Sequence, residues 1–335
     1  MPTELRSRIH TPYTGRLDLP PGFKEVPLRE AGDAFGHAEK IAAKEGAGTL
    51  VWVRRFDMVE FAVVLEPEEP LAAARRSFYV AMCALFDALA SHAPPEKSLC
   101  FVWPDAMLVD GGLVAGTRLG WPARADEKSP PRWLVFGAMV RSAIMGGAEP
   151  GTRPTAASLE EEGFDELGSG RLVETFARHL LTWTDTWQQE GYRPVFEHYL
   201  ERLPVDEPVE RSIDGFGNLL TRRKGKLDTT KRQLIPALAE RDWYDADSRG
   251  LKLCSCCAPS ASIRRTPLCS SVLPSPASGR CAGPSRSGMR IRSRSPASAD
   301  RRFDRGSSAC SHSAGRPWCR LSKPRMPIVR PWWTR

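Results

Sequence analysis

Cysteine is scarce through most of this 335-residue chain, because only Cys83 and Cys100 of its nine cysteines precede residue 250. Two thiols can form at most one bond, which excludes a disulfide-stapled scaffold for that part of the sequence. The other seven cysteines follow residue 250. Their one C-x-x-C pair, Cys254 and Cys257, lacks the second pair with ligand spacing that a zinc site needs. We therefore expect neither a disulfide framework nor a metal site.

Long hydrophobic runs are also missing. The richest apolar stretch, residues 77–89, falls short of the roughly 20 residues that span a bilayer. Residues 1–21 are polar and rich in proline, unlike a secretory signal with its charged and then apolar segments. The sequence thus predicts a cytoplasmic protein that has no membrane partner.

Glutamate is absent after residue 250, and this absence divides the chain into two unlike parts. Residues 251–335 hold 17 Lys and Arg against two Asp, whereas residues 1–250 hold 31 basic and 38 acidic side chains, a net charge of −7. The sequence pI of about 9.1 therefore reflects the last 85 residues. We expect no nucleic-acid binding by the first 250 residues, since basic excess is the usual footprint of such binding.

The last 85 residues contain 17 Ser, 15 Arg, 10 Pro and 7 Cys, which predicts a disordered basic tail over residues 251–335. One interpretation is a basic arm that binds nucleic acid through phosphate contacts, and a second is a solvated linker. The third is a slip of the reading frame near residue 250. We favour it because apolar periodicity stops after Gly250. Resequencing the gene across codon 250 tests this hypothesis.

The first 250 residues alternate between strand-like and helical patterns, which predicts an α+β fold with a mixed, largely antiparallel sheet flanked by helices. Strands are predicted at residues 23–28, 48–54, 58–65, 99–102, 106–109, 113–121 and 133–144. Helices are predicted at residues 33–45, with Asp33 as the cap and Gly46 ending the helix, and at residues 71–90, 171–190 and 194–203. A Pro-bounded linker at 204–208 then precedes a hairpin at 212–220 and a short helix at 231–241. We divide the chain into an N-terminal extension (1–19), a main domain (20–204), a small C-terminal β module (205–250) and the tail.

The most informative segment runs from Trp103 to Gly116 and reads W-P-D-A-M-L-V-D-G-G-L-V-A-G, a strand, a turn and a strand. It resembles, without a gap, the K-W-P-N-D-x-x-V-D-G-K-K-x-A-G segment of biotin/lipoate protein ligases. The matching residues are Trp103, Pro104, Val109, Asp110, Gly111, Ala115 and Gly116. The order of the surrounding elements agrees over about residues 20–245. The resemblance implies the fold of class II synthetases and biotin ligases.

The same resemblance implies a two-step reaction in which biotin or lipoate attacks ATP, usually with Mg²⁺, to form an acyl-adenylate. A lysine of a biotinyl or lipoyl carrier protein then takes the acyl group. The residues implied at the substrate and adenylate site are Arg54 and Arg55 at the acid or phosphate, Trp103 and Asp105 in the ligand slot, Gly111 in the turn, and Gly116 where the adenylate approaches the backbone. No residue is assigned a catalytic role.

The sequence departs from the family pattern where positive charge is needed. The two lysines of the pattern fall on Val102 and Leu113. Arg118 lies five residues beyond Leu113, an odd offset that in a regular strand places it on the opposite face. One alternative is therefore a non-catalytic ligand- or carrier-binding protein. Another is acyl transfer from a carrier without ATP, for which Cys100 is the candidate nucleophile.

Overall fold

The computed structural model describes residues 15–145, 155–164, 167–204, 209–223, 225 and 228–253. These residues belong to one compact unit, so the proposed boundary between residues 204 and 205 stays a prediction. Most of the N-terminal extension and of the tail lies outside the described residues. Within the described part, none of the helices combines the length and the apolar character that crossing a bilayer demands.

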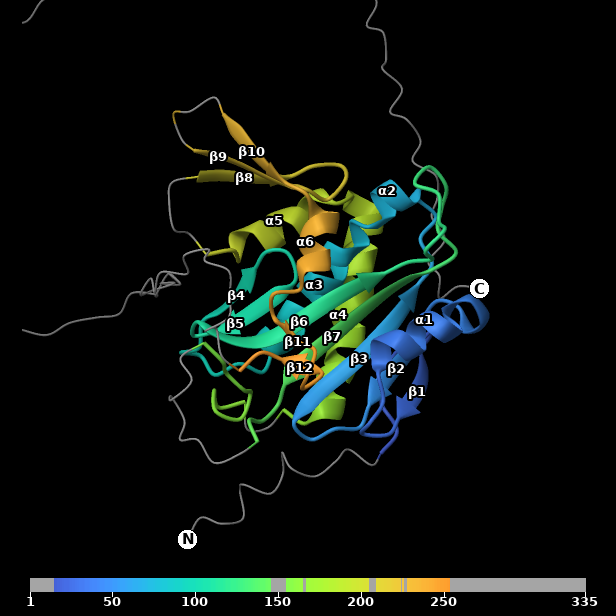
Figure 1. The fold of residues 1–335 in the computed structure, drawn as a ribbon, viewed down its shortest axis with the longest axis vertical. Coiled ribbons are helices and arrows are strands. Elements are labelled where there is room, and N and C mark those ends of the chain that lie inside the picture. The colour runs from blue at the N-terminus through green and yellow to red at the C-terminus, as the bar shows by residue number, and fades with distance from the viewer. Residues whose placement is uncertain are drawn as a thin grey trace, which may run out of the picture. The chain divides into compact units, whose positions relative to one another are not determined.

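A seven-stranded sheet forms the centre of the fold (Figure 1). Its strands are β1 (Lys24–Leu28), β2 (Thr49–Val53), β3 (Met58–Leu65), β4 (Leu99–Val102), β5 (Ala106–Val109), β6 (Gly112–Gly120) and β7 (Leu134–Arg141). They lie in the order β1-β2-β3-β7-β6-β5-β4. Only the β1–β2 pair is parallel, and the other pairs of this sheet are antiparallel. This arrangement confirms the predicted α+β class with a largely antiparallel sheet.

The helices are α1 (Ala34–Glu45), α2 (Leu71–Ala74), α3 (Ser77–Ala90), α4 (Ser169–Glu190), α5 (Arg193–Glu201) and α6 (Leu234–Glu240). The predicted cap of α1 is confirmed, because the Asp33 carboxylate accepts a hydrogen bond from the backbone N–H of Gly36 at 2.9 Å. Gly46 ends the same helix with a φ of 79°, a conformation that favours glycine.

The prediction of one helix over residues 71–90 is wrong in its middle, where the chain turns between α2 and α3. Two arginines at the break are held by acids from neighbouring loops. Arg75 donates two hydrogen bonds to Glu127, and Arg76 donates to Glu69 at 3.0 Å. The hydrophobic stripe continues in phase across the break, so periodicity alone could not reveal it.

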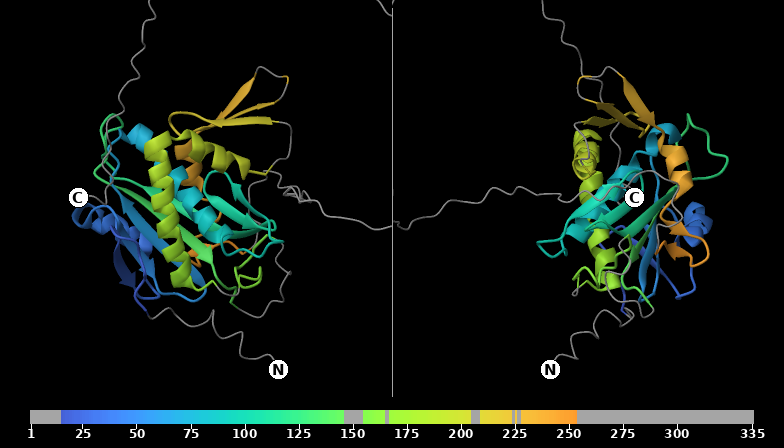
Figure 2. Two further views of the ribbon diagram at one scale, coloured as in Figure 1. Left: turned by 180° about the vertical axis from the view of Figure 1, so that it is seen from behind. Right: turned by 60° about the vertical axis from the view of Figure 1, so that its left-hand side comes forward.

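The larger core lies between the sheet and helices α3, α4 and α5, which cover one face of it (Figure 2, left). Phe176 of α4 stacks on Phe136 of β7 and contacts Phe61 of β3, with ring centroids 5.9 and 4.6 Å apart. Every residue of β3 and β7 is buried, as expected for the long apolar strand predicted at 133–144. The two strands thus form the buried centre of the sheet.

The opposite face of the sheet is covered by two separate elements, both in front of it in Figure 1. Helix α1 packs through Ala34, Ala38 and Ala42 on β2, β3 and β7. The rest of this face carries a third apolar cluster, in which Trp243 and Leu251 from the C-terminal part of the chain meet side chains of the sheet. Gly116 of the Trp103–Gly116 segment faces this cluster through Trp243.

A small C-terminal sheet follows the helices, as predicted. It consists of β8 (Val209–Ile213), β9 (Leu219–Arg223) and β10 (Thr229–Arg232), and the chain continues through α6 to the two-residue strands β11 (Tyr244–Asp245) and β12 (Gly250–Leu251). The predicted helix at 231–241 begins later, at Leu234, because its first residues pair with β9. Pro236 falls in the first turn of α6, where its missing N–H has no partner to lose.

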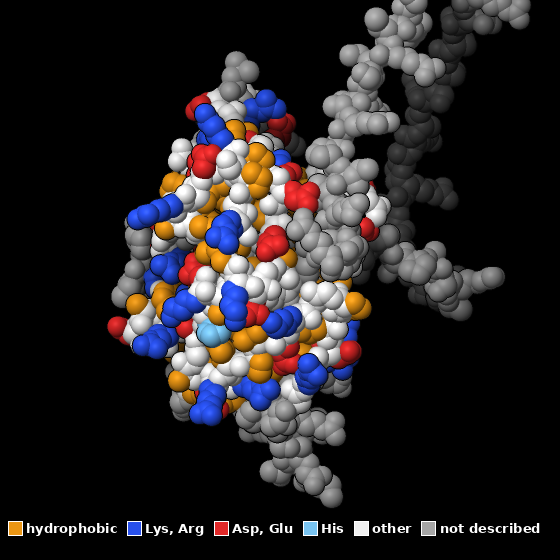
Figure 3. All heavy atoms as spheres, turned by 90° about the vertical axis from the view of Figure 1, so that its right-hand side faces the viewer, with side chains coloured by type: hydrophobic (Ala, Val, Ile, Leu, Met, Phe, Trp, Pro, Cys, Tyr) orange, Lys and Arg blue, Asp and Glu red, His pale blue; other side chains and the backbone are white. Residues whose placement is uncertain are grey.

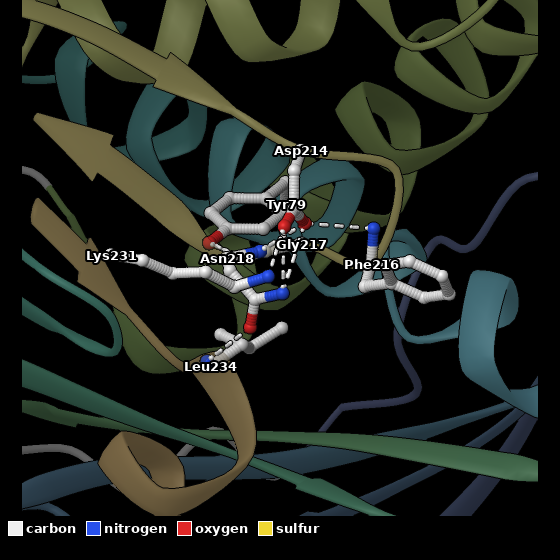
Figure 4. A network of polar contacts seen from close by, with 7 residues as sticks. All are labelled: Tyr79, Asp214, Phe216, Gly217, Asn218, Lys231 and Leu234. Carbon is white, nitrogen blue, oxygen red and sulfur yellow. Dashed lines mark hydrogen bonds and ion pairs between the residues drawn. The ribbon is translucent and has the colours of Figure 1, made fainter. Parts of the chain in front are cut away.

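The turn between β8 and β9 is built around the carboxylate of Asp214 (Figure 4). It accepts hydrogen bonds from the backbone N–H groups of Phe216 and Asn218, both at 2.9 Å, and pairs with Lys231 at 2.9 Å. Burial acts to raise the pKa of Asp214, but the bonds from Asn218 and Lys231 dominate and lower it to about 2. Asp214 is therefore a charged structural centre of the small sheet.

The same turn ties the small sheet to the main core (Figure 4). The Tyr79 hydroxyl of α3 donates to the carbonyl of Gly217 at 2.7 Å and accepts from the Trp103 indole at 3.0 Å. The Asn218 side chain accepts from the N–H of Leu234 at 3.0 Å and so fixes the start of α6. These contacts determine where the chain beyond α6 meets the sheet.

The surface of the described residues mixes side chains of all kinds. On the face in Figure 3, basic and acidic groups are interspersed with apolar ones. Four large apolar side chains are exposed, namely Met145, Phe216, Ile235 and Leu253. The expectation that this part of the chain binds no nucleic acid stays a prediction.

Candidate functional site

The hairpin of β5 and β6 carries the motif that the sequence singled out. Asp110 and Gly111 have φ values of 47° and 84°, the left-handed pair typical of a two-residue hairpin turn, so the predicted turn is confirmed. The Asp110 carboxylate also accepts from the N–H of Ser98 at 2.9 Å. Gly111 is exposed at the tip, where its conformational freedom serves the turn.

A β-bulge in this hairpin changes which side chains share a face. Met107 pairs with Ala115 but Leu108 pairs with Leu113, so Val114 is an extra residue in β6. Val114 and Ala115 both pack into the larger core. Leu113, by contrast, packs against the third cluster beside Trp243, and the Arg118 guanidinium lies 5.8 Å from the same indole ring. The prediction that Arg118 faces away from Leu113 is therefore wrong, because the alternation rule holds only for a regular strand.

A small pocket, here called the slot, lies beside Gly116 on this face of the sheet, and it is almost completely filled. Its lining includes Phe35 of α1, Gly116 and Arg118 of β6, Gly137 of β7, and Trp243. The remaining cavity measures about 10 Å³, at the lower limit for a single water molecule. A slender carboxylic acid cannot enter while the indole occupies this place.

Trp243 lies flat against the backbone of β6. A Cβ atom added to Gly116 would come within 2.1–2.6 Å of three ring carbons, closer than real contacts allow. The indole N–H donates to Oδ2 of Asp105 at 2.8 Å, and the side chain is 4% exposed. Gly116 thus permits a close approach to the backbone, as expected, but the group that approaches is an indole of the same chain.

Asp105, the acceptor of that hydrogen bond, is 5% exposed. Burial raises its pKa to about 7, against the opposing effect of the Trp243 hydrogen bond. Among nearby charges, Asp242 raises this pKa further and Arg241 lowers it. A buried carboxyl needs a partner, and the partner is Trp243, the single tryptophan of residues 205–250, to which no sequence signal pointed.

Asp105 should make stability depend on pH. Its pKa rises from 3.8 in the unfolded chain to about 7 in the native state, so stability falls as pH rises from 4 to 7 and then levels off. Asp105→Asn keeps an acceptor for the indole and loses the ionisation penalty, although its amide leaves a buried donor unpaired. We expect the variant to be more stable than the wild type by on the order of 2 kcal/mol at pH 8 but not at pH 4. Urea unfolding at both pH values measures this, and a difference independent of pH contradicts it.

Trp103, the other residue expected to shape the slot, lies in the larger core. Its indole donates to the Tyr79 hydroxyl, and the guanidinium of Arg232 lies 4.6 Å from its ring centroid. The bond between Trp103 and Pro104 is cis. Trp103 therefore links α3, β4 and the small sheet, and of the Trp-Pro-Asp segment only Asp105 contacts the residue that fills the slot.

Arg54 and Arg55 do not line the filled slot. Arg55 makes two hydrogen bonds to the Asp57 carboxylate, at 2.9 and 2.6 Å, and this pairing raises its pKa. Arg54 lies against the Trp52 ring, 5.7 Å from its centroid. Cys100 is half-buried on the edge strand β4, two strands away from Gly116. Of the residues named from the sequence, the structure brings together Asp105 and Gly116.

Two other arginines belong to this face, and sequence reasoning did not assign them to it. Arg118 lies against Tyr244, 4.4 Å from the ring centroid, and its Nη2 is 3.7 Å from the sulfur of Met139. Arg141 ends β7 and is 3% exposed. It donates to four backbone carbonyls, those of Leu113, Ala157, Leu251 and Lys252, at 2.8–3.1 Å. Adjacent strands thus place two guanidinium groups on the same face of the sheet.

Two carboxylates are close enough to influence Arg118. Glu60 of β3 is buried and accepts from the N–H of Ala34 at the start of α1, at 2.9 Å. Burial raises the pKa values of Glu39 and Glu60, and the positive charge of Arg118 partly opposes this rise. The region between α1 and β6 therefore combines a cation with two acids of reduced acidity.

Other features of the described residues do not coincide with this site. They include no group of three or more His, Cys, Asp or Glu side chains that could hold a metal ion. A wider and more open hollow of about 540 Å³ lies at the end of α3 and along α4, with Arg171, Arg178, His92 and His179 on its walls. None of the residues predicted for the site lines that hollow.

Comparison with known proteins identifies the relatives of the chain. A family model described as the biotin/lipoate A/B protein ligase family matches residues 19–201. A biotin–acetyl-CoA-carboxylase ligase of Paracoccus denitrificans is 27% identical over 234 residues, which cover 66% of this chain and 92% of that protein. The matched family range ends before Trp243.

The fold is also found in a solved structure. A biotin protein ligase-like protein of unknown function from Silicibacter sp. TM1040 aligns with a TM-score of 0.57 and 24% identity, over 66% of this chain and 99% of that one. Biotin protein ligase from Aquifex aeolicus aligns with a TM-score of 0.49 and 13% identity, over 63% of this chain and 96% of that one.

Proposed function

The chain belongs to the biotin/lipoate A/B protein ligase family, and from this premise we propose that it activates biotin or lipoate with ATP and attaches the acyl group to a lysine of a carrier protein. In the first step the carboxylate attacks the α-phosphorus of ATP, and pyrophosphate leaves. In the second the lysine amine attacks the acyl carbon, and AMP leaves. The acceptor is a biotinyl or lipoyl carrier protein, and the proposed location is the cytoplasm.

The observation that supports this proposal most strongly is the glycine-floored slot beside the motif hairpin. Gly116 and Gly137 lie on adjacent strands, and a Cβ added at Gly137 would come within 2.5 Å of the Phe35 ring. Because neither position carries a side chain, a flat group can lie directly on the backbone there. A fused ring of the size of indole already fits there.

Positive charge near the slot supports the catalytic form of the proposal. The lysines of the family pattern are replaced by Val102 and Leu113. The bulge in β6, however, brings Arg118 to the face that Leu113 occupies. A cation there can neutralise the acid or the phosphates as charge develops. Arg54 and Arg55 remain proposed ligands of the same anions.

The proposal assigns no residue to Mg²⁺. An ion that accompanies ATP is held mostly by phosphate oxygens and water, with one or two carboxylates from the protein. The carboxyl group that lines the slot, Glu60, is buried, accepts a hydrogen bond from the N–H of Ala34 and has a raised pKa. Asp105 is likewise buried, hydrogen-bonded and has a raised pKa. The described residues therefore do not form a site that fits the ion, and no step is derived through it.

Two observations favour a second candidate, a protein that binds the acid or the carrier without catalysis. The slot is filled by Trp243, and both lysine positions carry apolar side chains. A protein that retains the fold and has lost adenylation would show both features.

Acid-dependent exchange of pyrophosphate into ATP tests the proposal. The full chain and its Trp243→Ala variant are assayed with biotin, lipoate and octanoate, and thermal stabilisation is measured in parallel. We expect exchange that depends on biotin or lipoate. Stabilisation without exchange supports the binding protein instead. If neither chain shows exchange or stabilisation, both candidate functions are ruled out.

A further inference from the structure

The group that fills the slot comes from a short and local piece of chain, residues 242–252. It follows α6 through Arg241, which has a φ of 44°. The segment folds on itself, since the N–H of Lys252 donates to the carbonyl of Trp243 at 2.9 Å and β11 pairs with β12. It is thus a small hairpin laid over one face of the sheet.

The apolar contacts of this hairpin are separate from the main core. Trp243 and Leu251 form a cluster of their own with Met58, Ala106 and Met139. The larger core between the sheet and helices α3, α4 and α5 contains neither of these two residues. The hairpin can therefore leave the sheet without opening that core.

The polar contacts of the hairpin engage a buried acid and a buried arginine on this face of the sheet. Trp243 donates its ring N–H to Asp105. The carbonyl groups of Leu251 and Lys252 accept from Nη2 of Arg141 at 2.8 and 3.0 Å. A neutral carbonyl is a weaker partner for a guanidinium than an anionic oxygen is. The hairpin thus places a ring N–H at Asp105. At Arg141 it places neutral carbonyl oxygens in the position that an anionic group of a ligand would take.

We propose that residues 242–252 are an internal occupant of the slot, and that a ligand binds by displacing this hairpin and taking over Asp105 and Arg141 from it. The ligand class that fits both contacts is a compact ring with an N–H donor that also carries an anionic group. The identity of the natural ligand rests on the proposed function. The displacement of Trp243 by a ligand ring does not depend on that function.

The expected size of the effect follows from competition. When a site is open in only a fraction of molecules, the apparent dissociation constant rises in inverse proportion to that fraction. The buried indole, its hydrogen bond and the Arg141 contacts all favour the closed form. We therefore expect removal of the indole to tighten ligand binding at least tenfold, which corresponds to about 1.4 kcal/mol.

The test compares three full-length variants with the wild type. Trp243→Gly removes the indole, and Trp243→Phe keeps a ring but loses the bond to Asp105. Trp121→Gly is the control for loss of an indole elsewhere, because Trp121 is half-buried on the loop after β6 and lies against Arg75. Isothermal titration measures binding of biotin and, as a probe independent of the function, of free indole.

Trp243→Gly is expected to bind biotin at least tenfold more tightly than the wild type, Trp243→Phe to lie between them, and Trp121→Gly to match the wild type. Binding of indole by Trp243→Gly alone, with no binding of biotin, supports the internal occupant and removes biotin as the ligand. Equal affinity of wild type and Trp243→Gly for biotin, or no binding of either probe by Trp243→Gly, overturns the inference. If Trp243→Gly does not fold, the same comparison rests on Trp243→Phe, and wild-type affinity in that variant overturns it.

Discussion

Replacing Gly116 with alanine is expected to force Trp243 off the sheet and to lower the free energy of unfolding by roughly 3–5 kcal/mol, the range for losing a buried large side chain. The new Cβ would lie 2.1 Å from the nearest indole carbon, and it is fixed to the backbone of an inner strand. Neither the strand nor the ring can yield by that amount, so the indole must leave. Urea unfolding measures the loss, and limited proteolysis reports release of residues 242–252.

Gly168→Ala is the matched control for that experiment. Nothing lies within 4 Å of a Cβ at Gly168, whose φ is −68°, so alanine is accommodated there. In a chain that already carries Trp243→Gly, the alanine at Gly116 should have little effect on stability, since the clashing group is absent. A Gly116→Ala chain as stable as the wild type would mean that the indole does not pack on β6 as described.

Gly116→Val extends the prediction from stability to function. A branched side chain at this position fills the slot itself, so acid-dependent exchange is expected to disappear even in the Trp243→Gly background. Survival of full exchange in that double variant would show that the acid binds elsewhere.

Arg118→Met is expected to lower acid-dependent exchange by about 10²–10³-fold, the usual effect of removing one group that stabilises developing charge. Methionine keeps much of the length and the apolar contacts with Tyr244 and Phe35 while removing the charge. Arg118→Lys retains the charge and should keep exchange within roughly tenfold of the wild type. Rates are measured at saturating acid and ATP, so that they report the reaction of the bound substrates and not their binding.

Arg55→Met discriminates this assignment from the one that the sequence alone favoured. Arg55 is already bonded twice to Asp57, so its loss should lower exchange less than the loss of Arg118 does. Strong loss of exchange in Arg55→Met, together with wild-type rates in Arg118→Met, would assign the anion-binding role to the loop between β2 and β3 and not to Arg118.

Local patterns were sufficient for much of the fold. The period of apolar residues located α1 and α4. Asp33 and Gly46 marked the ends of α1, and Asp110-Gly111 marked the hairpin turn. These features depend on interactions between residues close in the sequence, and composition or spacing reports them directly. The break between α2 and α3 was not predicted, because the apolar stripe continues across it and its two arginines pair with Glu69 and Glu127 outside the helices.

The sequence by itself determined the family motif, the α+β architecture and the existence of a glycine where a group must approach the backbone. Tertiary structure alone decided which group that is. Arg118 shares a face with Leu113 because a bulge inserts one residue into β6, and Trp243 reaches Asp105 across 138 residues of chain. Neither a register shift between strands nor a contact between distant segments leaves a periodic trace in the sequence, since both depend on how finished elements pack together.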